Sequence, residues 1–72
     1  MKKIKKIKIK INGKFSMINE NLTLSAFLKQ LKIPLKKIAI ELNREIIDKN
    51  KTNKIKLKSN DKIEIVHFIG GG

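Results

Sequence analysis

The 72-residue sequence contains no cysteine, tryptophan or tyrosine, and only one histidine and one proline. The absence of cysteine excludes disulfides, thiolate nucleophiles and cysteine–metal sites. His67 alone cannot form a histidine metal cluster. The longest apolar runs, such as residues 38–40, fall far short of the roughly 20 residues that span a membrane. We therefore expect neither a metal centre nor a membrane span.

Acidic residues are also scarce, since 18 Lys and Arg residues face 6 Asp and Glu, for a formal net charge of +12. The excess lies in residues 1–37, which hold eleven lysines and one acid. Such a basic half is typical of nucleic-acid or anionic-membrane binding. However, phosphate recognition favours arginine, and base stacking needs aromatic rings. Lys, Ile and Asn, whose codons are A/T-rich, make up 38 of the 72 residues, so we favour genome composition as the cause and expect no nucleic-acid partner.

The first half of the chain predicts a hairpin followed by a helix. Isoleucine and lysine alternate over residues 7–11, as in a half-buried strand. Asn12-Gly13 then predicts a tight turn into a second strand over residues 14–18. Thr23 is placed to cap a helix that Pro34 ends. The apolar stripe of this helix has helical spacing and comprises Leu24, Phe27, Leu28 and Leu31.

The second half predicts three more strands and no second helix. The strands cover residues 38–42, 45–47 and 63–69, with residues 48–54 as a polar loop. The resulting order, β-β-α-β-β-β, predicts an α+β fold in which one helix packs across a mixed sheet of four to five strands. The first and last strands are expected to lie parallel in the middle of this sheet. A chain of this size buries only about 60% of its unfolded surface, so we expect one domain, without a walled active site.

Three of the four glycines form the end of the sequence, Gly70-Gly71-Gly72. A flexible tail is the simplest interpretation, but it does not explain why glycine alone follows a strand rich in large apolar residues. Glycines can thread a narrow slot, and three residues reach about 10 Å. They could carry a terminal carboxylate into another protein's active site for activation, so the chain itself needs no catalytic residue and is expected not to be an enzyme. We divide it into a domain of residues 1–69 and a tail of residues 70–72.

The segment of residues 61–72 resembles the C-terminal segment of the ThiS family of sulfur carriers in thiamine biosynthesis. Weaker matches are spread along the remaining chain, at Asn12-Gly13, Thr23, Leu28, residues 40–43 and Ile46-Ile47. The resemblance implies a ubiquitin-like β-grasp fold, which agrees with the predicted order of elements.

By this resemblance, the carboxylate of Gly72 is adenylated by a ThiF-type adenylyltransferase that uses ATP. Sulfur from a cysteine desulfurase then converts it to a thiocarboxylate, which donates sulfur to a ThiG-type thiazole synthase. Gly71 and Gly72 are the implied functional pair, with Gly72 alone modified and Gly70 adding slack. No cofactor is expected to stay bound, and the free carrier is expected to be a monomer.

Two other functions stay open. A molybdopterin-synthase small subunit or a tRNA-thiolation carrier would share the diglycine end, although the preceding residues look more like the thiamine carrier. A small basic RNA-binding module would belong to a different class, and it would need the lysines rather than the glycines. Because no signal-peptide pattern follows the basic start, we expect a cytoplasmic location, with a plastid stroma as the alternative.

The last strand also offers candidate docking residues. If Ile63 and Ile65 face the helix, Val66 and Phe68 face the other side of the sheet. They could dock a partner or simply pack within the sheet, and the sequence leaves both interpretations open. His67 has no evident orienting partner, so we favour a structural role for it over acid–base chemistry.

Overall fold

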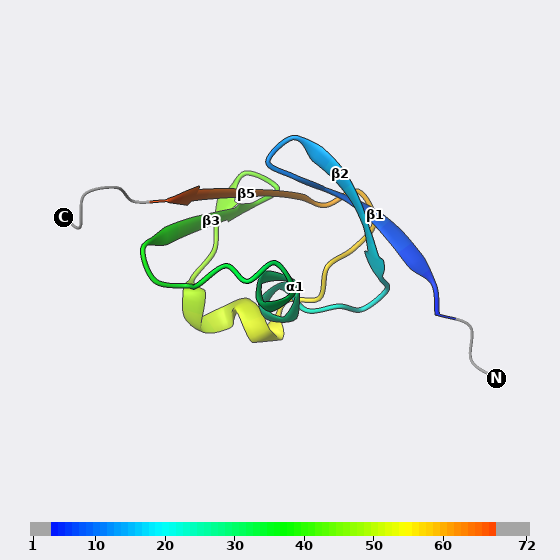
Figure 1. Ribbon diagram of the computed structural model, residues 1–72, viewed down its shortest axis with the longest axis horizontal. Helices are drawn as coiled ribbons and strands as arrows, with labels where there is room; N and C mark the ends of the chain where they lie inside the picture. Colours follow the sequence, from blue (N-terminus) through cyan, green and yellow to red (C-terminus); the bar gives the residue numbers. More distant parts are fainter. Residues whose placement is uncertain (1–3, 68–72) are drawn as a thin grey trace.

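The computed structural model describes residues 4–67 and shows one helix packed under a five-stranded mixed sheet (Figure 1). The strands are β1 (Lys6–Ile11), β2 (Lys14–Asn19), β3 (Ile38–Leu42), β4 (Glu45–Ile46) and β5 (Lys62–His67). The helix α1 spans Leu24–Gln30, and a 3₁₀ helix, η1, spans Lys49–Lys54. The strand order is β2-β1-β5-β3-β4, with β1 and β5 parallel and the other pairs antiparallel. The predicted α+β fold and the parallel pairing of the first and last strands are confirmed.

Two tight turns close the hairpins at the two edges of the sheet. Asn12 and Gly13 both have positive φ, at 47° and 83°, and they bring Lys14 opposite Ile11. Asn43 and Arg44, at 51° and 72°, make the equivalent turn between β3 and β4. Positive φ at both central residues matches the right-handed twist of the flanking strands, which explains why Asn begins each turn.

The helix begins where the sequence predicts and ends earlier. The Thr23 hydroxyl accepts a hydrogen bond from the Ala26 amide at 3.1 Å and caps the first turn. The helix stops at Gln30, well before Pro34, because Lys32 adopts a left-handed conformation with φ of 58°. The following residue, Ile33, turns back toward the helix, as in a Schellman motif.

This early end also corrects the predicted apolar stripe. Leu24, Phe27 and Leu28 are buried, but Leu31 is the C-cap residue and is 43% exposed. The three buried side chains pack against the inner face of the sheet. The described core consists of ten residues: Ile9, Ile18, Leu24, Phe27, Leu28, Ile38, Ile40, Leu57, Ile63 and Ile65.

The segment predicted as a polar loop, residues 48–54, is instead mostly the 3₁₀ helix η1 beside α1 (Figure 1). The Asp48 carboxylate caps it by accepting a hydrogen bond from the Asn50 amide at 2.9 Å. Thr52 is buried, and its hydroxyl donates to the Lys49 carbonyl. Without an apolar stripe, this helix could not be recognised from hydrophobic spacing. Within residues 4–67, no helix has the length and apolar content needed to cross a membrane.

Candidate functional site

The strand β5 leads to the glycine tail and lies centrally in the sheet, between β1 and β3. The predicted site residues Phe68, Gly70, Gly71 and Gly72 lie outside the described residues, so their roles stay predictions. The structure therefore describes how the chain supports and orients the strand that precedes the tail.

Two asparagine side chains, one from each neighbouring hairpin, hold β5 from its two sides. The Asn12 side-chain oxygen accepts a hydrogen bond from the Ile65 amide at 2.8 Å. The Asn43 oxygen accepts one from the Lys62 amide at 2.9 Å. Both asparagines are also turn residues with positive φ. Each therefore closes a hairpin and satisfies a backbone donor of β5, which couples the two turns to the strand that precedes the tail.

Asp61 secures the beginning of β5. Its carboxylate accepts hydrogen bonds from the Lys58 amide at 2.7 Å and from the Asn43 side-chain amide at 3.0 Å. Asp61 is only 9% exposed, so its carboxylate is a buried part of the turn before β5 rather than a solvent-facing group. The bond to Lys58 follows from the tendency of Asp to bond the backbone of its own turn, whereas the contact with Asn43 depends on the tertiary fold.

The inner and outer faces of β5 differ as the alternation of its residues predicts. Ile63 and Ile65 are buried against the core, while Val66 is 53% exposed on the outer face. Strand register places Val66 opposite Ala39, and Ile46 opposite Glu41. Because Val66 and Ile46 remain largely exposed, they do not form a covered packing contact. The role of Val66 in docking stays a prediction.

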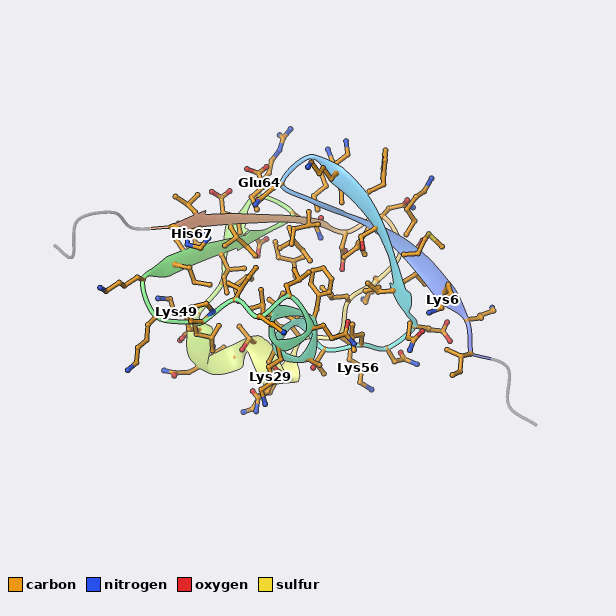
Figure 2. All side chains as sticks on the ribbon, viewed as in Figure 1. Lys6, Lys29, Lys49, Lys56, Glu64 and His67 are labelled. Atoms are coloured by element: carbon orange, nitrogen blue, oxygen red, sulfur yellow. The ribbon has the colours of Figure 1, made fainter. Side chains whose placement is uncertain are left out.

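His67, at the described end of β5, pairs with Ile38 in the strand register. It is exposed, although alternation places it on the same face as the buried Ile65. Figure 2 shows it at the end of the sheet remote from Lys6. The structural role of His67 stays a prediction.

A second exposed cluster lies on the outer face at the other side of the sheet, and the sequence interpretation missed it. We call Lys8, Lys10, Phe15 and Met17 the β1–β2 patch. Phe15 and Met17 are 67% and 58% exposed, and they lie opposite Lys10 and Lys8, respectively. The lysine ammonium groups approach the Phe15 ring centroid to 5.0 Å and 4.9 Å. The signal was present in the sequence, because the Asn12-Gly13 turn sets this register.

Residues 4–67 form no pocket. Within the same residues, no group of three His, Asp or Glu side chains is arranged to hold a metal ion. The exposed apolar side chains on the outer face of the described sheet are Phe15, Met17, Ile46 and Val66.

The ThiS family model matches residues 4–72 of the chain. Sulfur carrier protein ThiS from Bacillus subtilis is 35% identical over 65 residues, which cover 89% of this chain and 98% of that protein. Thiazole synthase from Paramagnetospirillum magneticum is 38% identical over 66 residues. Thiazole synthase from Magnetococcus marinus is 35% identical over a segment of the same length. The chain spans about one fifth of the length of these two synthases.

The fold is similar to the crystal structure of the thiamine biosynthesis protein ThiS from Geobacter metallireducens. The TM-score is 0.79 at 29% identity, and the match covers 92% of this chain and all of that one. This likeness confirms the β-grasp fold expected from the resemblance. The family match over residues 4–72, a relative of similar length and the shared fold together show that the chain belongs to the ThiS family.

Proposed function

We propose that this chain carries sulfur as a thiocarboxylate on Gly72 for formation of the thiazole of thiamine. A carboxylate is ionised and unreactive near neutral pH, so it needs activation by another protein. A ThiF-type adenylyltransferase joins it to the AMP part of ATP and releases pyrophosphate. The persulfide of a cysteine desulfurase then displaces AMP to form an acyl disulfide, which a thiol such as excess cysteine reduces to the thiocarboxylate with release of the desulfurase thiol. The thiocarboxylate passes its sulfur to a ThiG-type thiazole synthase.

The central position of β5 is the observation that carries this proposal. Buried Ile63 and Ile65 hold the strand from one face, and Asn12 and Asn43 hold its backbone. A strand supported in this way gives the tail a defined starting point and direction. The glycines that follow can enter a narrow active site because they have no β-carbons.

In this proposal the chain supplies the group to be modified and its partners supply the catalysis. ATP is a substrate of the activating enzyme, so the carrier binds no permanent cofactor. The similarity to sulfur carrier protein ThiS of Bacillus subtilis supports the carrier role. The similarity to segments of two thiazole synthases supports a ThiG-type acceptor.

Intact mass spectrometry tests the modification. The chain is incubated with ATP, a ThiF-type enzyme, a cysteine desulfurase and cysteine. We expect exchange of one oxygen for sulfur at the terminus, and loss of this exchange when Gly72 is deleted. Leu35→Ala, a change at a partly exposed position in the loop after α1, serves as the control that keeps the exchange.

Two outcomes would contradict the proposal. One is the absence of exchange under conditions in which the same enzymes modify the ThiS protein of their own organism. The other is a native polypeptide that continues beyond Gly72 without processing. Transfer of the sulfur to a molybdopterin precursor or a tRNA-modifying enzyme, but not to thiazole synthase, would retain the carrier chemistry and reassign the pathway.

Docking through Val66 and Phe68 belongs to the same proposal. Val66 is exposed on the outer face of β5, close in sequence to the tail. Phe68→Ala should slow adenylation without changing the melting temperature, because the partner loses an apolar contact. An adenylation rate equal to that of wild type would reject the anchor.

A further inference from the structure

The outer face of the sheet is divided by charge. In β1, alternation places Lys6, Lys8 and Lys10 on this face, and parallel pairing sets Lys62 of β5 beside Lys10. Farther along β5, Glu64 pairs with Glu41 of β3. Figure 2 shows Glu64 on the outer side of the sheet, with Lys29 on the opposite side of the molecule. One half of the face is therefore basic and the other carries two neighbouring acids.

The basic half has an apolar centre. Phe15 and Met17 are the largest exposed apolar side chains of β2. Lys8 and Lys10 place their ammonium groups 4.9 Å and 5.0 Å from the centre of the Phe15 ring. No acid among residues 4–67 forms an ion pair with these two lysines, and the ring is their observed partner. Cation–π contacts at exposed sites are weak, about 0.5–1 kcal/mol, so the lysines remain available to a stronger anionic partner.

We propose that the β1–β2 patch docks a protein surface that combines carboxylates with apolar side chains. Resting on the proposed function, we assign this surface to the enzyme that activates Gly72. Carboxylates of the partner pair with Lys8 and Lys10, and its apolar groups cover Phe15 and Met17. The β1–β2 patch is a second contact area, separate from Val66, which lies on the other half of the sheet.

The division of charge also determines the orientation of the complex. If the partner were rotated so that its carboxylates met the β3–β5 half, they would approach Glu41 and Glu64. Like charges brought together at an interface disfavour the wrong arrangement. The patch therefore selects the orientation in which β5 points toward the partner's active site.

Several observations favour a protein partner over single-stranded RNA. The patch has one aromatic ring, which two ammonium groups already approach, whereas single-strand binding uses several free rings as stacking platforms. Its cations are lysines, which lack the bidentate fork of arginine for phosphate. Met17 adds apolar area that a phosphate backbone does not use.

Binding measurements without ATP test the patch separately from the chemistry. The dissociation constant of the chain for a ThiF-type adenylyltransferase is measured by titration calorimetry at low and high salt. We expect Lys8→Glu/Lys10→Glu to weaken binding about tenfold at low salt, with a smaller loss at high salt. The control Lys29→Glu/Lys51→Glu alters exposed lysines of α1 and η1. Both double variants have a formal charge of +8, four below the wild-type value of +12.

Further variants keep the test decisive. Lys8→Gln/Lys10→Gln removes the charges without reversing them, and it replaces the Glu variant if circular dichroism shows that variant to be unfolded. Phe15→Ser tests the apolar centre and should also weaken binding. Intact mass analysis of the same wild-type sample reports thiocarboxylate formation, so failure of the proposed function is seen independently of binding.

Three results would overturn the inference. The first is equal weakening by the patch variant and by the Lys29/Lys51 control, since net charge alone would then explain the effect. The second is unchanged binding in the patch variants, or no binding by wild type. The third is tighter, patch-dependent binding of a fluorescent oligouridylate than of the enzyme, which would assign the patch to RNA.

Discussion

Asp61→Ala tests whether a buried carboxylate holds the beginning of β5. The substitution removes the acceptor for the Lys58 amide and the Asn43 side chain. Each hydrogen bond to a charged group contributes about 1.5–3 kcal/mol, and water can partly replace the bond to Asn43 because its side chain is exposed. We therefore expect a loss of about 3 kcal/mol in the free energy of unfolding. For a domain of this size, this corresponds to a fall in melting temperature of about 15–20 °C.

Thermal unfolding followed by circular dichroism measures the effect. Asp48→Ala is the matched control, because Asp48 is exposed and accepts one capping hydrogen bond, from the Asn50 amide. Asp48→Ala should lower the free energy of unfolding by about 1 kcal/mol or less. The loss for Asp61→Asn should lie between those for Asp48→Ala and Asp61→Ala. The side-chain oxygen of asparagine can accept one of the two original hydrogen bonds, but its NH₂ group is a donor and cannot accept the other. If Asp61→Ala melts at the same temperature as Asp48→Ala, the carboxylate does not hold β5 as described.

Three further substitutions test other parts of the fold. Ile40→Ala, at a fully buried position of β3, should lower the free energy of unfolding in urea by about 3–4 kcal/mol; a change below about 1 kcal/mol would contradict a close-packed core. Lys32→Gly should raise stability by about 0.5–1 kcal/mol, because glycine adopts the observed φ of 58° without strain; lower stability would argue against the Schellman end. Asn12→Ala should lower the free energy of unfolding by about 2 kcal/mol, because alanine disfavours the positive φ and leaves the Ile65 amide without its acceptor. Hydrogen exchange at the Ile65 amide should become faster in this variant.

The strands and turns were predictable because their signals are local. Alternation over residues 7–11 and the Asn12-Gly13 turn together predict the strand, its buried face and its register. The turn at Asn43-Arg44 follows from similar chemistry. The α1 cap at Thr23 was equally accessible, since a hydroxyl residue before an apolar helical stripe is a local pattern.

The errors occurred where local signals were weak or misleading. Leu31 continues the helical spacing, but the chain turns at Lys32, a residue that rarely adopts positive φ. Pro34 gave a plausible but late stop. Residues 48–54 lack an apolar stripe, so nothing in their pattern distinguished a capped 3₁₀ helix from a loop. In these segments backbone hydrogen bonds and packing against α1 outweighed intrinsic preference.

The candidate site likewise combines features that the sequence predicted with features that only the structure showed. The glycine tail and its likeness to the ThiS family were visible in the sequence, as was the exposed face of Val66. The contacts that support β5 were not, because Asn12 and Asn43 are distant in sequence from the amides that they bind. The β1–β2 patch required both the register of the hairpin and the observation that neither helix of residues 4–67 covers this face.

By itself, the sequence determined the order of elements, the hairpin turns, most of the core and the family, because alternation, turn residues and motif identity act over short stretches of chain. Only the tertiary structure decided which distant polar groups meet at β5 and how charge divides the open sheet. Those outcomes depend on the order and register of strands that are far apart in sequence. Because β5 pairs between β1 and β3, the strand before the tail is supported on both sides and the outer face of the sheet is divided into a basic and an acidic half.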